Sequence, residues 1–140
     1  MIHQSLPGIR RLYTMPCSAL PRYAMLTAIC GGVVVLSPSS LTLINFSGTP
    51  LLTWERTFNA GARQEKATLT FRTDADIPEG FRIAFVVECV NGKQYLLGKY
   101  EPNYPVIEYS ESSGEITGNP AVRTYTVTVT DIKAVLPAIV

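Results

Sequence analysis

The chain has 140 residues, which is the usual length of a single domain. Hydrophobic residues make up 46% of it and charged residues only 16%, so the composition excludes a highly charged disordered chain. The formal net charge of +1 excludes the strong positive field that marks most nucleic-acid-binding domains, and we therefore expect no nucleic-acid partner.

The two ends of the chain differ in character from its middle. We expect residues 1–20 to form an extended N-terminal arm or an edge strand, with the edge strand over residues 9–15. Residues 21–140 are then expected to form a single β domain. The final segment, residues 134–140 (AVLPAIV), is an apolar tail that contains a proline. Because exposing such apolar side chains to water is unfavourable, we expect this tail to dock on its own domain or on a neighbouring subunit.

An uncharged hydrophobic stretch covers residues 23–36 (YAMLTAICGGVVVL). Its roughly 14 residues are too few for a membrane-spanning helix, which needs about 20. The arginines upstream leave open a cleaved secretory signal, although several prolines precede the stretch and no small-residue cleavage site follows it. The interpretation that we favour is two core strands, residues 24–30 and 33–36, joined by a turn or bulge at Gly31-Gly32.

Hydrophobic residues recur at every second position in three later segments, which predicts β-strands. The alternation covers residues 67–71, 81–89 and 124–130. In the second segment both faces are partly apolar, so this strand should lie in the centre of a sheet that is covered on both sides. In the third segment the second face consists of threonines, which predicts a strand with one half-exposed face.

Asn91-Gly92 separates two apolar runs and is a strong signal for a hairpin. The two-residue type I′ turn that this pair favours needs positive φ at both positions. We therefore expect residues 81–90 to pair with residues 93–100, Gly92 to have positive φ, and Phe85 and Val87 to be buried.

Turn-forming residues bound several weaker segments. The strands expected among them cover residues 41–46, 52–58 and 106–110. The expected turns and loops cover residues 47–50, 74–80 and 112–120. Residues 59–66 are the best candidate for a single turn of helix. These patterns together predict an all-β fold, a single antiparallel β-sandwich or barrel of about eight to ten short strands with extended termini.

The sequence contains no pattern of catalytic or metal-binding residues, so we do not expect an enzyme. Its one histidine, His3, lies near the N-terminus, and a Ser-His-Asp triad is therefore not expected. Cys17, Cys30 and Cys89 lack the spacing of a zinc site and are predicted to be small buried hydrophobic residues. We predict no catalytic residue, no metal site, no cofactor and no small-molecule substrate.

Other polar and aromatic residues also have a simple structural interpretation. The carboxylates Asp74, Asp76 and Glu79 do not match a calcium-binding loop and are interpreted as a solvated acidic segment. Trp54, the one tryptophan, is predicted to anchor the core or an interface. The tyrosines around the predicted hairpin are interpreted as strand and interface residues rather than a base-stacking surface; they are Tyr95, Tyr100, Tyr104 and Tyr109.

Several motifs between residues 50 and 140 also resemble a known family. They are Thr53-Trp54-Glu55, residues 63–71 (RQEKATLTF), residues 84–87 (AFVV), residues 91–98 (NGKQYLLG) and Tyr104-Pro105-Val106. In these motifs the chain is similar to a family of small proteins encoded in phages and prophages of Bacteroides-type gut bacteria, beside head and tail genes. The resemblance implies a structural place in a virion or phage-like particle. It implies no activity and brings no functional residues.

We therefore expect a phage virion structural protein, a tail, neck or connector component that acts as a subunit of a symmetric assembly. It would be located in the virion, which is assembled in the host cytoplasm, and its partners would be other copies of itself and neighbouring virion proteins, with no membrane. The residues expected at the assembly interface are Leu136, Ile139, Val140 and Trp54. The alternative is a secreted, periplasmic or surface β-sandwich that binds a carbohydrate or a host protein, and it requires residues 24–36 to be a signal segment.

Overall fold

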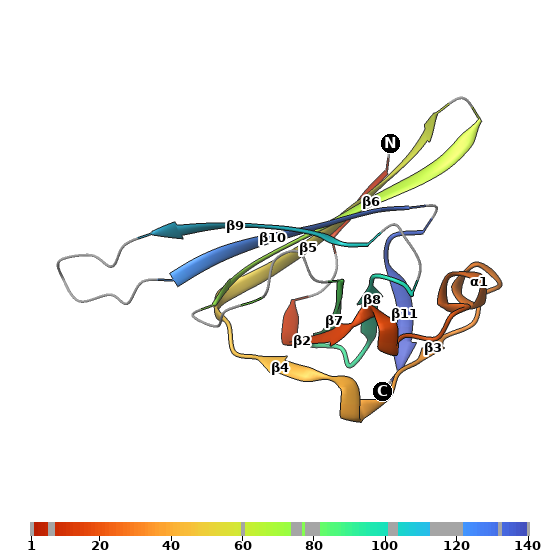
Figure 1. Ribbon diagram of the computed structural model, residues 1–140. Coiled ribbons are helices and arrows are strands. Elements are labelled where there is room, and N and C mark those ends of the chain that lie inside the picture. Colours follow the sequence, from red (N-terminus) through yellow and green to blue (C-terminus); the bar gives the residue numbers. More distant parts are fainter. Residues whose placement is uncertain are drawn as a thin grey trace.

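The computed structural model describes residues 2–5, 8–59, 61–73, 77, 82–100, 104–112, 122–131 and 133–139. Two β-sheets pack on one another, and short helical segments lie on the far side of the second sheet (Figure 1). The expected all-β class with sandwich-like packing is therefore confirmed.

The first sheet has five strands, and every neighbouring pair in it is antiparallel. In spatial order the strands are β1 (Ile2–Ser5), β5 (Ser47–Asn59), β6 (Ala62–Thr73), β10 (Val122–Asp131) and β9 (Val106–Ser112). β5 and β6 form a long hairpin that projects from one end of the molecule, and β9 and β10 project from the opposite end (Figure 1).

The second sheet has six strands, of which β3 and β11 are parallel and the other neighbouring pairs are antiparallel. In spatial order the strands are β3 (Val34–Val35), β11 (Leu136–Ile139), β8 (Gln94–Leu97), β7 (Ile83–Cys89), β2 (Ile9–Pro16) and β4 (Thr42–Ile44). The helical segments lie in the connections and comprise a 3-10 turn at Cys17–Ala19, α1 at Ala24–Ile29 and a 3-10 turn at Pro38–Ser40.

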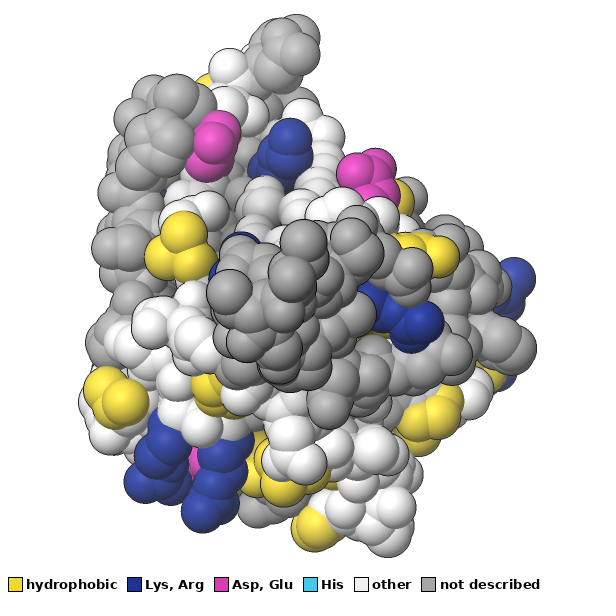
Figure 2. All heavy atoms as spheres, turned by 90° about the vertical axis from the view of Figure 1, so that its left-hand side faces the viewer, with side chains coloured by type: hydrophobic (Ala, Val, Ile, Leu, Met, Phe, Trp, Pro, Cys, Tyr) yellow, Lys and Arg dark blue, Asp and Glu magenta, His cyan; other side chains and the backbone are white. Residues whose placement is uncertain are grey.

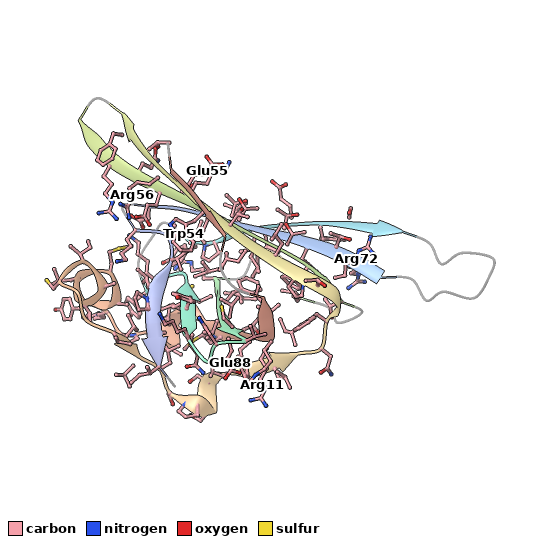
Figure 3. All side chains as sticks on the ribbon, turned by 180° about the vertical axis from the view of Figure 1, so that it is seen from behind. Arg11, Trp54, Glu55, Arg56, Arg72 and Glu88 are labelled. Atoms are coloured by element: carbon pink, nitrogen blue, oxygen red, sulfur yellow. The ribbon has the colours of Figure 1, made fainter. Side chains whose placement is uncertain are left out.

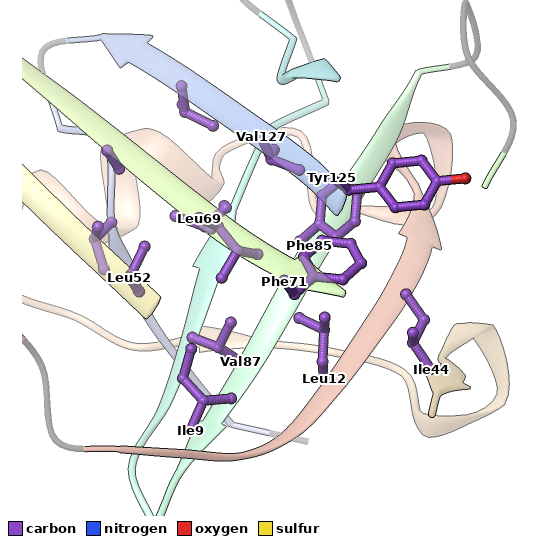
Figure 4. Packing of buried hydrophobic residues seen from close by; sticks show 14 of the residues in the cluster. Ile9, Leu12, Ile44, Leu52, Leu69, Phe71, Phe85, Val87, Tyr125 and Val127 are labelled. Carbon is purple, nitrogen blue, oxygen red and sulfur yellow. The ribbon is translucent and has the colours of Figure 1, made fainter. Parts of the chain in front are cut away.

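The main hydrophobic core fills the space between the two sheets (Figure 4). Its residues on β6 and β10 are the alternating hydrophobic positions that the sequence predicted, and Leu69 pairs with Val127 across the two strands. The Phe71 ring stacks on Tyr125 with centroids 5.5 Å apart and lies 6.0 Å from the Phe85 ring. The threonines of β10 lie half-buried between these core positions, as expected for a strand with one half-exposed face.

A second hydrophobic core lies on the other side of the six-stranded sheet. Phe85 and Val87 of β7 point to the main core, whereas Ala84 and Val86 point to the second core. Both faces of β7 are therefore buried, which confirms the central position that its apolar pattern predicted.

The hairpin predicted around Asn91-Gly92 is confirmed as β7–β8, but its loop is longer than expected. The backbone N–H of Cys89 donates to the carbonyl of Lys93, and the N–H of Gly92 donates to the carbonyl of Cys89, both over 2.9 Å. Gly92 has a φ of +85°, as predicted. The result is a three-residue loop with glycine in the left-handed position, which is a common hairpin class, in place of the two-residue type I′ turn.

Residues 24–30, which we expected to form a strand, are mostly helical. α1 buries Ala24 and Ala28, which are four residues apart, and the N–H of Thr27 donates to the carbonyl of Tyr23 over 2.8 Å. Alanine, methionine and leucine favour a helix, and Gly31, with a φ of +86°, ends it in the left-handed conformation. The predicted strand over residues 33–36 is present as the shorter β3.

Strand pairing corrects three further expectations. The described part of residues 59–66 forms the tip of the β5–β6 hairpin and not a helical turn, and residues 47–50 belong to β5, where its register with β6 shifts. β2 is not an edge strand because it pairs with both β7 and β4. The other two expected loops, residues 74–80 and 112–120, lie outside the described residues apart from Ile77 and Ser112. The weaker strands are confirmed as parts of β4, β5 and β9.

Candidate functional site

The structure separates the C-terminal residues that we expected at an assembly interface. β11 lies inside the six-stranded sheet between β8 and β3, so this segment belongs to the chain's own fold and is not a free tail. Leu136 is 1% exposed and pairs with Leu96, which corrects the expectation that it contacts another subunit. Ile139 is 52% exposed, and Val140 lies outside the described residues.

Trp54, the fourth expected interface residue, lies half-buried on β5. It packs against the main core from the inner side of the five-stranded sheet, whereas Glu55 extends from the outer side (Figure 3). Of the two roles predicted for Trp54, this position favours that of a core anchor.

Helix α1 has apolar side chains on both its buried and its exposed side. Ala24 and Ala28 are buried in the second core and Met25 packs against it, whereas Leu26 and Ile29, together with Tyr23 just before the helix, are exposed. A surface helix normally buries its large apolar side chains, because the favourable free energy of burial grows with apolar area. α1 therefore presents an apolar face that nothing in the described part of the chain covers.

A second apolar surface lies beside α1, at the open edge of the six-stranded sheet. β3 pairs with β11 on one side and, among the described residues, with no strand on the other. Val35 and Ile139 are opposite each other in this pair and both are exposed, and Val33, two residues before Val35, is exposed as well. Next to them is a groove of about 450 Å³ whose lining includes Val33, Ile139, Tyr95 and Pro137.

We call these exposed side chains the α1–β3 patch; one part is Tyr23, Leu26 and Ile29 at α1, and the other is Val33, Val35 and Ile139, which by strand alternation lie on the opposite face of the sheet from α1. Each exposes between 45% and 70% of its surface. On the face at the opposite end of the molecule from α1, hydrophobic side chains are scattered (Figure 2). The α1–β3 patch is therefore the candidate functional surface.

Buried charge in this protein holds strands together. Glu65 on β6 is buried and accepts hydrogen bonds from Arg63 over 2.6 Å, from Arg56 on β5 over 3.3 Å and from the backbone N–H of Ala134 over 3.3 Å. One carboxylate thus ties the β5–β6 hairpin to the segment that leads into β11. Because a buried N–H without an acceptor costs about 1–3 kcal/mol, this arrangement has a structural role.

Three further ion pairs, at two places in the fold, also join strands. Glu88 on β7 lies near two arginines of β2, with Arg10 at 3.0 Å and Arg11 at 3.7 Å (Figure 3). Lys99, just after β8, lies 2.6 Å from Asp131 at the end of β10. The first contact joins neighbouring strands of one sheet, and the second joins the two sheets.

The predicted tyrosines do not form one surface for a ligand. Tyr100 and Tyr104 pack against the second core, and chain cations lie over both rings, with Arg22 5.4 Å from the Tyr100 centroid and Arg82 4.8 Å from the Tyr104 centroid. These contacts within the chain agree with the interpretation of the tyrosines as packing residues. The acidic set Asp74, Asp76 and Glu79 lies outside the described residues.

Within the described ranges, no group of three or more His, Cys, Asp or Glu side chains could hold a metal ion. The same part of the chain has no helix that is long and apolar enough to cross a membrane. Comparison with protein-family models, curated proteins and solved structures found no match for this chain.

The exposed side chains of α1 are not evident from the sequence, because its pattern over residues 24–30 favours a strand. A signal for the helix was present in the spacing of four residues between Ala24 and Ala28 and in the glycines that follow. The exposed side of this short helix could not be recognised, because both sides are apolar: Ala24, Met25 and Ala28 pack on the second core, and Leu26 and Ile29 are exposed.

The three cysteines are predicted to differ in reactivity. Burial raises the pKa of the Cys17 thiol to about 11 and also raises the pKa of Cys89, whereas Cys30 is exposed. With iodoacetamide at pH 8, Cys30 should be alkylated first, and Cys17 and Cys89 only when the chain unfolds, because the thiolate is the nucleophile. Peptide mass spectrometry over time measures this order, and labelling of Cys17 as fast as Cys30 in the folded chain would contradict it.

The Cys17 thiol also makes stability depend on pH in a defined direction. Its pKa is higher in the folded chain, about 11, than the ordinary value of 9.0, so folding favours the neutral thiol. This contribution to the free energy of unfolding is fully present below pH 9.0 and is lost as the pH rises through about 11. A Cys17→Ala variant should lack this part of the alkaline loss of stability in denaturant titrations.

Proposed function

We propose that this chain is a structural protein of a phage virion, a tail, neck or connector component that works as one subunit of a symmetric assembly. The observation that carries the proposal is the α1–β3 patch, since apolar side chains left uncovered on two faces of a small domain favour contacts with other proteins. The resemblance in residues 50–140 suggests the kind of particle. The low share of charged residues is compatible with a subunit enclosed by neighbours.

The position of residues 24–36 weighs against the secreted alternative. A cleaved signal would remove this segment, which contains α1 and β3. Ala28, Val34 and Leu36 are buried in the second core together with Leu136 of β11. Removing the segment would expose that core to water, so a chain with this fold keeps these residues.

The proposal predicts that the chain is a component of the particle. Phage particles purified on a density gradient from a lysate of the host bacterium should contain the chain at a fixed ratio to the major structural proteins, as measured by quantitative mass spectrometry. Interrupting its gene should yield particles that lack the chain and have an altered tail, neck or connector in electron micrographs. Finding the chain only outside the particle fraction, with particle structure unchanged by its loss, would contradict the proposal.

A further inference from the structure

We propose that copies of this chain join head to tail, with the edge strand β9 of one copy seated in a groove beside α1 of the next. This inference deepens the proposed function and rests on it, because it names the two surfaces through which neighbouring subunits would meet. Three features support it: the groove with its positive charge, an exposed carboxylate that matches this charge, and the positions of the two at opposite ends of the molecule.

The groove beside α1 is apolar and has a cation in its wall. Its volume is about 350 Å³, and its apolar lining consists of Tyr23, Met25, Leu26 and Ile29. The other lining residues are Arg22 and Lys99. Lys99 lies 2.6 Å from Asp131, which neutralises it, so the net charge of the groove comes from Arg22.

Arg22 is well placed to bind a carboxylate. Its guanidinium lies over the Tyr100 ring, 5.4 Å from the centroid, which limits the orientations of the side chain. The residue is exposed, and no carboxylate in the described ranges forms an ion pair with it. A guanidinium held over a ring keeps N–H groups for hydrogen bonds, and carboxylates accept two of them at once. The groove therefore favours a partner that brings a carboxylate next to apolar side chains.

Glu108 on β9 supplies such a carboxylate. It is exposed, and its neighbour on β10 is the uncharged Thr126. Within the described part of the chain it forms no ion pair. Every other carboxylate described there has a cation of this chain as an ion-pair or cross-strand partner; these are Glu55, Glu65, Glu88 and Asp131. Charge complementarity thus selects Glu108 as the partner of Arg22.

β9 also brings apolar side chains beside this carboxylate. Val106 lies two residues before Glu108, on the same face of the strand, and is 56% exposed. Tyr109, the next residue after Glu108, is 47% exposed. β9 is the last strand of its sheet and, among the described residues, pairs with β10 alone, so its other side is open to a second chain. The strand therefore carries both the charge and the apolar surface that the groove would bind.

The two surfaces lie far apart on one copy. α1 is at one end of the molecule, and β9 projects from the opposite end (Figure 1). A contact between them is therefore made between copies, and each copy contacts two neighbours, one through each end. Such a head-to-tail contact closes into a ring if the rotation from copy to copy completes a full turn, and otherwise it continues as a filament. A ring of this kind is a symmetric assembly of the sort that the proposed function requires.

The experiment measures the mass of the purified full-length chain by sedimentation over a range of concentrations. The wild-type chain should form species larger than two copies of the 15.3 kDa monomer. Arg22→Glu and Glu108→Arg each place like charges against one another and should each raise the dissociation constant of the contact at least about tenfold. The double variant that carries both substitutions restores opposite charges and should regain most of the lost affinity.

Lys93→Glu is the matched control. Lys93 is also exposed and lines the other apolar groove, beside β11, so its reversal changes the net charge as Arg22→Glu does but at a different place. It should leave assembly unchanged. Circular dichroism melting of each variant confirms that the chain is folded.

Several results would overturn the contact. They are a wild-type chain that stays monomeric or stops at two copies, a double variant that assembles no better than the single variants, and a Lys93→Glu variant that loses assembly as Arg22→Glu does. Binding to anionic phospholipid vesicles that Arg22→Glu abolishes, with assembly insensitive to Glu108→Arg, would assign the groove to lipid. Head-to-tail assembly in a chain absent from purified particles would refute only the proposed function. A chain present in particles whose assembly ignores both charge reversals would refute only the contact.

Discussion

Phe85→Ala is expected to lower the free energy of unfolding by about 3–5 kcal/mol, the range for removing a large aromatic side chain from a core. Phe85 is 0% exposed, lies on a strand that is buried on both faces and contacts the Phe71 ring. Because Phe85 lies in the main core between the two sheets, the surrounding residues can move only partly into the space left by the ring. Urea titration followed by circular dichroism measures the change.

The matched control for this substitution is Phe58→Ala. Phe58 is 71% exposed on the projecting part of β5, so removing its ring should change the free energy of unfolding by less than about 0.5 kcal/mol. Similar losses for the two variants would mean that Phe85 does not occupy the centre of the main core.

Gly98→Ala should cost about 2–5 kcal/mol, because it combines two independent penalties. Gly98 has a φ of +132°, a conformation that residues with a side chain rarely adopt. A β-carbon at this position would lie 2.8 Å from Cβ of Ala84, 3.2 Å from its Cα and 3.3 Å from Cγ of Pro105. Two of these three atoms belong to the buried residue Ala84 on the central strand β7, which cannot move without disturbing the sheet.

Gly92→Ala separates the two penalties. Gly92 also has positive φ, +85°, but a β-carbon there would meet nothing within 4 Å. Its cost should therefore be the conformational term alone, about 1 kcal/mol. Thermal and urea unfolding of both variants give the comparison, and an equal cost at the two positions would show that the close approach between Gly98 and β7 is absent.

Hydrophobic alternation predicted the strands with one face on the core and one face toward water. Residues 67–71 and 124–130 alternate because one face of β6 and of β10, neighbours in the five-stranded sheet, packs on the main core. Threonines occupy the positions between the core residues. β7 was also predictable, since a strand covered on both sides has no polar face. The hairpin after β7 was evident from Asn91-Gly92, although the loop class depends on how the ends of both strands pair.

Hydrophobic alternation does not predict the structure of segments whose two faces do not differ in polarity. Residues 59–66 are polar because the described part of this segment lies at the tip of a hairpin that projects from the core, so the residues resembled a helical turn. Residues 24–30 are apolar on both sides, which removed the contrast between a strand and a short helix.

The sequence by itself determined the all-β class, the inward-facing residues of the central strands and the glycine with positive φ in the β7–β8 loop. These features depend on the nearest residues along the chain, through side-chain alternation and the steric limits of φ. Only the tertiary structure decided that Leu136 is buried while Ile139 and one side of α1 are exposed. Leu136 is covered because β11 pairs with β8 and β3, which lie far from it in the sequence. Exposure at such positions depends on which distant segments come together, and no local pattern encodes that choice.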